Sequence, residues 1–422
     1  MADYAPRVVD ALLDELQPHL AATSIYGPKG VGKTATARRR ATSVLKLDDE
    51  LDLERVRADP TVITSLSAPL LIDEWQRYPA SWDRVRRAVD DGAEPGRFLL
   101  TGSSTPRGVS VHSGAGRIVG LRMRPMSLYE RRIAEPTVSL SAMLAGRAAI
   151  DGETDLVLGD YVEEIVSSGF PGIRSAPRRA RSSLMRAYIE TIVQREFPEQ
   201  GYPVRRPESL LGWLAAYAAA ESSTARYSEI LDAATPAQGD KPAKTTTIAY
   251  RDALSALWLL DPTPAWVAEG SLLGRLGQAP KHHLADPALA AHLLQLDTDA
   301  LLAGSRNARR PWGGSILGAL FESLVTLDVK VFASNVEARV YHARDRNGLH
   351  EVDLVVQGAG GRVVALEVKL TATIQDTDVK HLLWLKDRLG DDVVDMAVVT
   401  TGRYAYRRSD GVAVIPAALL RP

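Results

Sequence analysis

Eight residues near the amino terminus have the types and the spacing that phosphate binding requires. They read Gly27-Pro28-Lys29-Gly30-Val31-Gly32-Lys33-Thr34. Glycines let consecutive backbone N–H groups turn toward phosphate oxygens, and the helix that follows directs the positive end of its dipole at the same anion. In this pattern Lys33 reaches the β- and γ-phosphates and the Thr34 hydroxyl ligates Mg²⁺. The motif predicts a phosphate loop that binds ATP or ADP together with Mg²⁺.

Two acidic residues end an apolar run downstream of this loop. The run Pro69-Leu70-Leu71-Ile72 is followed by Asp73 and Glu74. This is the pattern of a buried parallel strand that delivers carboxylates to its C-terminal edge. We expect Asp73 to hold Mg²⁺ through water and Glu74 to orient and deprotonate the attacking water. An apolar run before Asp-Glu is common by itself, and it is informative here because an intact phosphate loop precedes it.

A hydroxyl and an arginine complete the predicted hydrolytic set. A second buried strand is expected at 97–101, and it ends in Thr101-Gly102-Ser103-Ser104. In ATPases of this architecture a polar residue at that point senses the γ-phosphate, so Ser103 is a candidate, with ordinary turn chemistry as the alternative. Arg117, after Gly116, is the candidate for a transition-state arginine, acting in its own subunit or across an interface. A surface or structural arginine is the alternative.

A second group of charged residues lies in the last third of the chain. In the predicted strand at 362–370, Glu367 and Lys369 project from one face of an otherwise apolar run. Asp353 lies likewise inside an apolar run at 351–357, and a glycine-rich turn at 358–361 joins the two strands. Charged side chains on buried strands are costly unless they are paired or coordinate something.

An acid, a hairpin and then Glu-x-Lys is the pattern of the PD-(D/E)xK nuclease fold. There the two acids and a helical glutamate, here Glu322, bind Mg²⁺, while the lysine positions water. The predicted order of helix, three strands, helix and strand between about 317 and 400 matches that fold. The sequence therefore predicts catalytic roles for Asp353, Glu367 and Lys369, with Glu322, Asp353 and Glu367 as metal ligands. The alternatives are a structural salt bridge, and a nuclease-like fold that has lost its activity.

The elements that position these residues divide the chain into three parts. Residues 1–150 alternate strands with helices, which predicts an AAA-type α/β domain with a doubly wound parallel sheet. Residues 151–300 are helical by periodicity and include a pair of helices, 226–233 and 245–259, that resembles a winged-helix module. Residues 301–422 are predicted to form the α/β nuclease-like domain.

Basic residues near that helical pair suggest contact with DNA. Lys241, Lys244 and Arg251 lie on or near the second helix, which in winged-helix folds enters the major groove. A basic surface that continues to Arg306, Arg309 and Arg310 would favour DNA, whereas an apolar patch would favour a protein partner. A helical linker with solvated basic residues is the alternative.

Composition limits the classes of partner. The chain of 422 residues has a formal net charge of −1, so a DNA-binding surface must be a local patch. It has no cysteine, which excludes disulfides and thiolate metal sites. No signal peptide is evident and no stretch approaches about eighteen uninterrupted apolar residues, so we expect a cytoplasmic protein without a membrane partner.

Taken together, these motifs make the chain similar to prokaryotic AAA-type ATPases that carry a C-terminal domain of unknown function. The matching runs in the first half are Gly27 to Thr34, Ile72 to Arg77, Leu100 to Ser104, Gly116-Arg117 and Pro125 to Glu130. Those in the second half are Gly169-Phe170-Pro171, Pro280-Lys281 with Asp286, Gly318 to Glu322, Glu351-Val352-Asp353 and Glu367-Val368-Lys369. The resemblance implies an ATPase domain, a winged helix and a PD-(D/E)xK-like module, in that order.

The leading hypothesis is a Mg²⁺-dependent ATPase whose nucleotide state controls a C-terminal half that binds DNA, with DNA cleavage left open. The rival is a nucleotide-gated switch that controls a protein partner and uses the nuclease-like module as an inactive scaffold. A third reading is regulatory DNA binding without cleavage. The sequence leaves open whether the protein forms a homo-oligomer.

Overall fold

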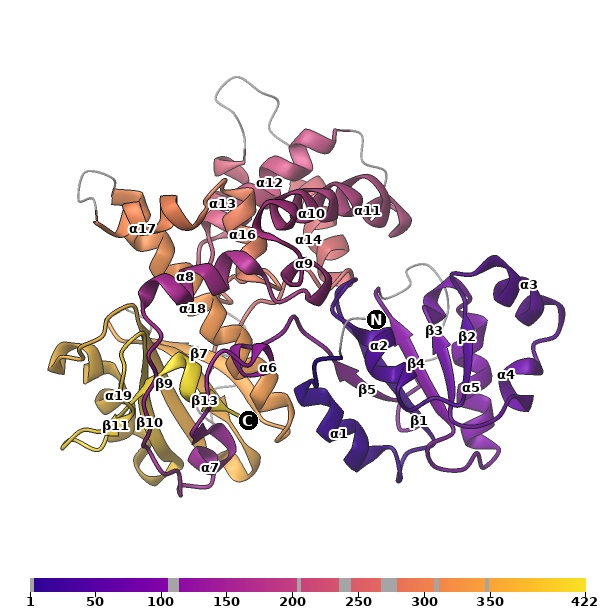
Figure 1. Cartoon of the computed structure of the whole chain (residues 1–422), viewed down its shortest axis with the longest axis horizontal. Helices are drawn as coiled ribbons and strands as arrows, with labels where there is room; N and C mark the ends of the chain where they lie inside the picture. The colour runs from indigo at the N-terminus through magenta and orange to yellow at the C-terminus, as the bar shows by residue number, and fades with distance from the viewer. Residues whose placement is uncertain are drawn as a thin grey trace.

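The computed structural model describes residues 4–104, 114–202, 206–234, 244–266, 279–306, 311–345 and 349–422. The chain forms three bodies, which Figure 1 shows as an N-terminal sheet domain, a helical layer and a C-terminal sheet domain. The two sheet domains lie side by side beneath the helical layer. No helix among the described residues is both long and apolar enough to cross a membrane.

The N-terminal domain is built on a five-stranded parallel sheet with the strand order β2-β3-β4-β1-β5. Its strands are β1 (Ala22–Tyr26), β2 (Ser43–Lys46), β3 (Leu70–Asp73), β4 (Phe98–Gly102) and β5 (Val119–Arg122). Its helices are α1 (Val8–Leu16), α2 (Lys33–Arg38), α3 (Glu50–Ala58), α4 (Val62–Ser65) and α5 (Ala80–Asp90). Strands β3 and β4 are buried along their whole length, as expected for parallel strands covered by helices on both faces. The predicted parallel α/β sheet is confirmed.

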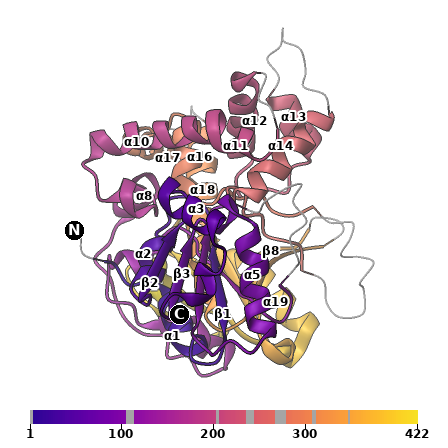
Figure 2. The same cartoon turned by 90° about the vertical axis from the view of Figure 1, so that its right-hand side faces the viewer.

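The helical layer lies above the N-terminal sheet, as Figure 2 shows from a second side. Its first part consists of α8 (Leu158–Ser167), α9 (Pro171–Arg174), α10 (Arg178–Thr191), the π-helical turn η2 (Ile192–Glu196) and α11 (Phe197–Glu199). The remaining helices are α12 (Pro207–Ala219), α13 (Tyr227–Ala233), α14 (Lys244–Ala256), α16 (Pro287–Leu293) and α17 (Thr298–Arg306). Aromatic rings lie between α12, α14 and the start of α11, where the Tyr250 ring contacts those of Phe197 and Trp213.

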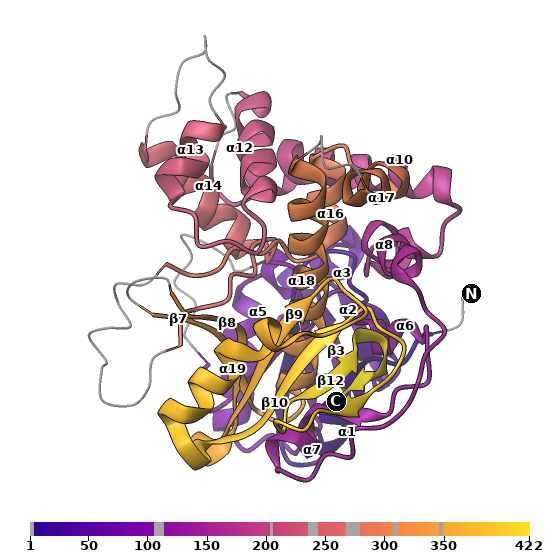
Figure 3. The same cartoon turned by 90° about the vertical axis from the view of Figure 1, so that its left-hand side faces the viewer.

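The C-terminal domain contains a six-stranded mixed sheet with the order β11-β12-β10-β9-β8-β7. Its elements are α18 (Pro311–Ser334), β7 (Arg339–Arg344), β8 (Glu351–Gln357), β9 (Val363–Lys369), α19 (Asp376–Leu389), β10 (Val393–Thr400), β11 (Tyr406–Arg407) and β12 (Ala413–Pro416). Alternate residues of β9 pack on opposite sides: Val364 and Leu366 join the core that contains α18, whereas Val363 and Ala365 join the core that contains α19. Figure 3 shows α19 beside this sheet. The predicted helix, strands, helix and strand are all present.

The N-terminal domain ends earlier than the predicted boundary at residue 150. After α6 (Leu128–Arg131), the short strand β6 (Val138–Ser139) pairs in parallel with the last strand of the chain, β13 (Leu420–Arg421). The next helix, α7 (Leu140–Leu144), packs against β9, β10 and α18, and Figure 1 shows it beneath the C-terminal sheet. Residues 138–144 therefore pack with the C-terminal domain, because their apolar side chains fill its core.

Candidate functional site

The predicted phosphate loop joins the C-terminal end of β1 to α2, and its backbone requires glycine. Gly27 has a φ of 154°, and a Cβ atom there would lie 2.0 Å from the carbonyl oxygen of Met123. Gly30 and Gly32 have φ values of 83° and 104°, in the left-handed region that L side chains rarely adopt. The three glycines thus allow the tight curl from which backbone N–H groups can face an anion.

Lys33 lies inside the curl of this loop. Its side chain is buried, and Nζ donates hydrogen bonds to the carbonyl oxygens of Gly27 at 2.9 Å and Pro28 at 2.8 Å. Burial lowers the pKa of Lys33 to about 8, while the carboxylates of Glu74 and Asp73 act in the opposite direction. The ammonium is therefore held at the loop's centre by neutral carbonyl groups, which phosphate oxygens can replace as partners.

The two predicted magnesium ligands are in direct contact. The Thr34 hydroxyl donates to Asp73 Oδ1 at 2.8 Å, and the Thr101 hydroxyl donates to the same carboxylate oxygen. Thr34 lies in the first turn of α2, Asp73 ends β3 and Thr101 lies in β4, so three elements bring these oxygens to one sheet edge. A hydroxyl beside a carboxylate next to a phosphate loop is a donor set that suits Mg²⁺, so the residues present fit the ion.

Glu74 follows β3 with a left-handed backbone, φ 53° and ψ 48°. Its Oε2 atom accepts a hydrogen bond from the Ser103 hydroxyl at 2.8 Å and another from Gln76 Nε2, which also donates to Ser103 at 3.1 Å. An unfavourable backbone conformation held in place by side-chain bonds is a feature of functional sites. The structure brings Ser103 to Glu74, and it adds Thr101 and Gln76, which lie in the motif runs but had no predicted role.

Arg117 lies at the opposite edge of the sheet from the phosphate loop. Strands β1 and β5 are parallel, and Thr23 near the start of β1 is opposite Val119 at the start of β5. The residues before Val119, including Arg117, therefore lie at the amino-terminal edge of the sheet. The phosphate loop follows β1 at the carboxyl-terminal edge. The exposed side chain of Arg117 pairs with Asp90 at the end of α5, with Nε and Oδ1 2.8 Å apart. Arg117 therefore lies away from the phosphate loop of its own chain in this structure, and its role as a transition-state arginine stays a prediction.

The helical layer contacts the outer side of the loop. Lys29 Nζ lies 2.6 Å from Oε1 of Glu196, in the π-helical turn, and the Tyr188 hydroxyl donates to the carbonyl oxygen of Lys29 at 3.1 Å. The ring of Phe170 lies 3.8 Å from the position of a Cβ atom on Gly30. The turn before Phe170 is fixed because Asp286, at the start of α16, accepts hydrogen bonds from Ser168 Oγ and Gly169 N. Turns of π-helix occur frequently at functional sites.

The charged residues predicted in the C-terminal domain also converge. Asp353 on β8, Glu367 on β9 and Glu322 on α18 gather at one place, and Lys369 Nζ lies 2.6 Å from Glu367 Oε2. Burial and the neighbouring Asp353 raise the pKa of Glu322 to about 8 and raise that of Glu367. One oxygen of Glu367, Oε1, is buried without a hydrogen-bond partner.

A lysine from the middle of the chain stands among these acids. Lys281 Nζ lies 2.8 Å from Glu322 Oε1 and 3.1 Å from both Glu351 Oε1 and Asp353 Oδ1. Within the described residues, no group of three or more histidine, aspartate or glutamate side chains has an arrangement that could hold a metal ion. The predicted metal set of Glu322, Asp353 and Glu367 stays a prediction: in this structure Glu322 and Asp353 contact the Lys281 ammonium, and Glu367 pairs with Lys369.

The predicted basic surface lies mostly outside the described residues. This applies to Lys241, Arg309 and Arg310 and to the side chains of Lys244 and Arg306. Arg251 is described, and its guanidinium lies 5.1 Å from the centre of the Tyr227 ring. The DNA-facing surface thus stays a prediction.

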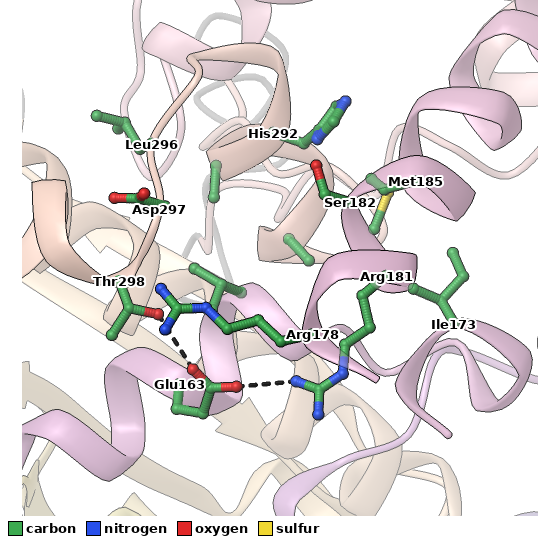
Figure 4. A pocket seen from close by; sticks show the side chains of 13 residues that line it. Glu163, Ile173, Arg178, Arg181, Ser182, Met185, His292, Leu296, Asp297 and Thr298 are labelled. Carbon is green, nitrogen blue, oxygen red and sulfur yellow. Dashed lines mark hydrogen bonds and ion pairs between the residues drawn. The ribbon is translucent and has the colours of Figure 1, made fainter. Parts of the chain in front are cut away.

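A pocket of about 120 Å³ lies in the helical layer between α8, α10, α16 and α17. Figure 4 shows the Glu163 carboxylate directed at Arg181 and Thr298, with Met185 and Ile173 on the apolar side. Arg181 Nη1 donates to Glu163 Oε1 at 2.8 Å and Thr298 Oγ1 donates to Oε2 at 3.1 Å. These polar groups satisfy one another, and none of the phosphate-loop residues lines the pocket.

A parallel sheet with a phosphate loop, paired Thr34 and Asp73 and an oriented glutamate is the arrangement of a P-loop nucleotide-binding domain. Residues 20–131 match the family model of an AAA domain. Residues 158–300 match a domain of unknown function (DUF8612), and residues 317–420 match another (DUF4143). The AAA match supports ATP binding and hydrolysis by the N-terminal domain.

Two curated proteins are similar along most of the chain. They are the uncharacterized protein Rv2008c of Mycobacterium tuberculosis and the uncharacterized protein Mb2031c of Mycobacterium bovis. Each is 25% identical over 403 residues, which is 93% of this chain and 79% of the relative.

Two solved structures show a weak similarity to this chain. The Walker-type ATPase PABY2304 of Pyrococcus abyssi has 15% identity and a TM-score of 0.40, covering 69% of this chain and 96% of its own. The ORC2 protein of Aeropyrum pernix, solved in ADPNP and ADP complexes, has 14% identity and a TM-score of 0.30, covering 72% of this chain and 97% of its own.

Proposed function

We propose that the chain is a Mg²⁺-dependent ATP hydrolase whose nucleotide state controls its helical layer and C-terminal half. The observation that carries the proposal is the meeting of Thr34, Asp73 and Glu74 at the sheet edge where the phosphate loop begins. Glu74 is held there by Ser103, so the hydrolytic group is oriented before the nucleotide arrives.

Each residue of this site has a distinct role in the proposed reaction. Lys33 leaves the carbonyl groups of its own loop and binds the β- and γ-phosphates. Thr34 and Asp73 hold Mg²⁺, which when bound supplies neutralisation of the phosphate charge. Glu74 accepts a proton from the attacking water, and Ser103 and Gln76 keep its carboxylate in the orientation that this transfer needs. Hydrolysis then releases the γ-phosphate, and Lys33 keeps only its contact with the β-phosphate of ADP.

The contacts around Lys29 supply a route from the nucleotide to the helical layer. Lys29 lies within the loop, and its ion pair with Glu196 and its hydrogen bond from Tyr188 tie the loop to η2 and α10. Phosphates that bind at the loop attract the Lys29 ammonium and weaken its pairing with Glu196. We therefore propose that ATP and ADP hold the helical layer in different positions.

We further propose that the helical layer carries a winged-helix module that binds DNA. Helices α12, α13 and α14 are followed by two antiparallel bridges, Leu260 with Leu284 and Thr263 with Lys281. Three helices followed by an antiparallel pair is the order of elements in a winged helix. Salt-sensitive binding to duplex DNA is expected if this module reads DNA.

The test compares wild type with Lys33→Ala in ATP hydrolysis and DNA binding. Wild type should hydrolyse ATP with Mg²⁺, and its affinity for a labelled duplex should differ between ADP and a non-hydrolysable ATP analogue. Lys33→Ala should lose hydrolysis and bind the duplex equally in both states. A folded wild type that hydrolyses no ATP overturns the ATPase proposal, and one that hydrolyses ATP but ignores the duplex overturns the DNA proposal alone.

A second candidate function is supported by the position of Lys281. Here the nucleotide gates a protein partner, and the nuclease-like module serves as an inactive scaffold. An ammonium group among the acids that would bind metal favours this reading, because metal-dependent phosphodiester cleavage needs that space. Cleavage of single- or double-stranded DNA by wild type with Mg²⁺ or Mn²⁺ would contradict it.

A further inference from the structure

Four carboxylates and two ammonium groups meet at the edge of the C-terminal sheet. We call Glu322, Glu351, Asp353 and Glu367 the acid cluster. Lys281 Nζ lies within 3.1 Å of the first three, and Lys369 Nζ pairs with the fourth. Carboxylate oxygens from α18, β8 and β9 meet here, and oxygen ligands of this kind are those that divalent cations take in proteins.

The two lysines of the cluster occupy different environments. The side chain of Lys281 is 1% exposed, whereas that of Lys369 is 32% exposed and projects from the sheet edge. Lys281 contacts acids from two elements, since Glu322 lies on α18 and Asp353 on β8. Lys369 contacts an acid on its own strand, Glu367. Lys281 is therefore the cation at the centre of the cluster, and Lys369 lies at its rim.

The backbone delivers Lys281 to this place from another part of the chain. Lys281 exchanges both of its backbone hydrogen bonds with Thr263, at 2.8 and 2.9 Å, in the antiparallel pair that follows α14. The next residue, His282, is tied by backbone bonds to Ser222 and Ser223, both at 2.8 Å. The backbone of Lys281 is therefore fixed on both sides, and its side chain, which is 1% exposed, has no route to solvent by rotation within the packed cluster.

We propose that the Lys281 ammonium is a resident cation that takes the place of a metal ion in the acid cluster and closes the nuclease-like module to divalent cations. Its amine presents three donors to three carboxylates, as a bound ion would present three coordination directions. The surrounding acids hold the pKa of Lys281 well above its usual range, so the ammonium keeps its charge. The proposal extends the scaffold reading above and does not depend on ATP hydrolysis.

The charge and the position of Lys281 have separate consequences. Removing either lysine lowers the charge of the cluster by one unit, but only Lys281→Ala also empties the centre. Lys281→Ala should therefore create a cation site formed by Glu322, Glu351 and Asp353, whereas Lys369→Ala should not. Comparing the two variants therefore shows whether Lys281 excludes metal by occupying the cation position or only by its positive charge.

The experiment titrates Mn²⁺ into nucleotide-free, full-length protein and measures free Mn²⁺ by electron paramagnetic resonance. Without nucleotide, the ATP site contributes no phosphate ligands, so failure of the ATPase proposal would not alter the result. Lys281→Ala should bind one Mn²⁺ ion that wild type does not bind. Its affinity for that ion should exceed any affinity of the wild-type cluster by at least about tenfold, because a unit charge at ion-pair distance has been removed. The double variant Lys281→Ala/Asp353→Asn should lose that ion. Wild type and Lys369→Ala should give the same titration.

Two outcomes would overturn the proposal. One is a Mn²⁺ ion bound by wild type that Asp353→Asn removes, because the cluster would then be open despite Lys281. The other is a folded Lys281→Ala, or the longer and uncharged Lys281→Gln, that binds no additional Mn²⁺. The wild-type titration decides the first point even if neither variant folds, and circular dichroism establishes folding for the second.

Discussion

Glu74 combines an unfavourable backbone conformation with two side-chain donors, Ser103 and Gln76. If it is the general base, Glu74→Gln should lower kcat for ATP hydrolysis by about 10²–10⁴-fold, since a positioned proton acceptor contributes on that order. The amide keeps the size of the side chain, so the affinity for ATP should stay within about threefold of wild type. Steady-state hydrolysis and nucleotide binding measured by calorimetry check both parts.

Glu94→Gln is the matched control, because Glu94 is exposed in the turn before β4 and its amide variant should hydrolyse ATP normally. Wild-type hydrolysis by Glu74→Gln would show that another group accepts the proton.

Gly27 gives a second prediction for a single residue. An alanine Cβ at this position would lie 2.0 Å from the Met123 carbonyl oxygen, and backbone cannot move aside as a flexible side chain can. Gly27→Ala should therefore distort the loop and weaken ATP binding by more than about tenfold, a difference of about 1.4 kcal/mol. Gly172→Ala in α9 is the control, since no atom lies within 4 Å of a Cβ there. Equal ATP affinity in the two variants would contradict the described loop geometry.

What the sequence reveals about single residues depends on how far apart the partners lie along the chain. The phosphate loop is contiguous, so eight adjacent residues carry its whole chemistry and predict it. Lys281 is 41 residues from Glu322 and 72 from Asp353, and no local pattern states that they meet. The alternation in β9 correctly predicted that Glu367 and Lys369 share a face. It could not predict that Lys281, from the antiparallel pair after α14, contacts the acid cluster to which Glu367 belongs.

Among the elements, α18 links the C-terminal domain to the N-terminal one through a buried acid. Asp328 Oδ1 accepts the backbone N–H of Leu128, at the start of α6, at 2.9 Å. Burial raises the pKa of Asp328 to about 8, with Glu130 acting in the same direction and Arg131 against it. The buried surroundings of Asp328 therefore favour its neutral form over its ionised form.

The raised pKa of Asp328 predicts how stability depends on pH. Between about pH 4 and pH 8 the unfolded chain releases this proton while the folded chain retains it, so the stability that Asp328 contributes is present below pH 4 and is lost as pH rises to 8. Asp328→Asn keeps the acceptor oxygen without the proton. Its stability relative to wild type should therefore rise by up to about 1.4 kcal/mol per pH unit from pH 5 to pH 8. Denaturant unfolding at both pH values measures this, with the exposed Asp391→Asn as control; a difference independent of pH would refute it.

Periodicity predicted which segments are helices and strands better than it predicted where they pack. Apolar runs such as β3 and β4 were recognised because burial on both faces leaves a continuous hydrophobic signature. The helix α7 has apolar residues that any core could accept, so nothing local distinguishes the N-terminal domain from the C-terminal one. The pairing of β6 with β13 places this segment with the C-terminal domain, and the paired residues Val138 and Leu420 are 282 positions apart in the sequence.

For the whole molecule, Asp261 joins the three bodies through one buried carboxylate. Arg122 and Arg124, at the end of β5 and just after it, approach Asp261 to 3.0 and 2.7 Å. Lys330 on α18 lies 3.4 Å from Asp261 Oδ1 and also donates to the Asp261 carbonyl oxygen. These three cations hold the pKa of Asp261 well below its usual range despite its burial. The N-terminal sheet, the segment after α14 and α18 therefore share a single counter-ion.

Removing that charge should loosen the molecule as a whole. Asp261→Asn leaves the buried Lys330 and the half-buried Arg122 and Arg124 without their anion, and loss of one partner from a buried ion pair costs about 3–5 kcal/mol. The matched control is Asp395→Asn, since Asp395 is equally buried but pairs with Arg407 inside the C-terminal domain alone. In scanning calorimetry Asp261→Asn should separate the unfolding of the N-terminal domain from that of the rest, whereas Asp395→Asn should lower one transition without splitting it. Unfolding of Asp261→Asn in the same transitions as wild type would show that apolar packing joins the three bodies. Any nucleotide-driven movement would then pass through those apolar contacts and not through Asp261 and its three cations.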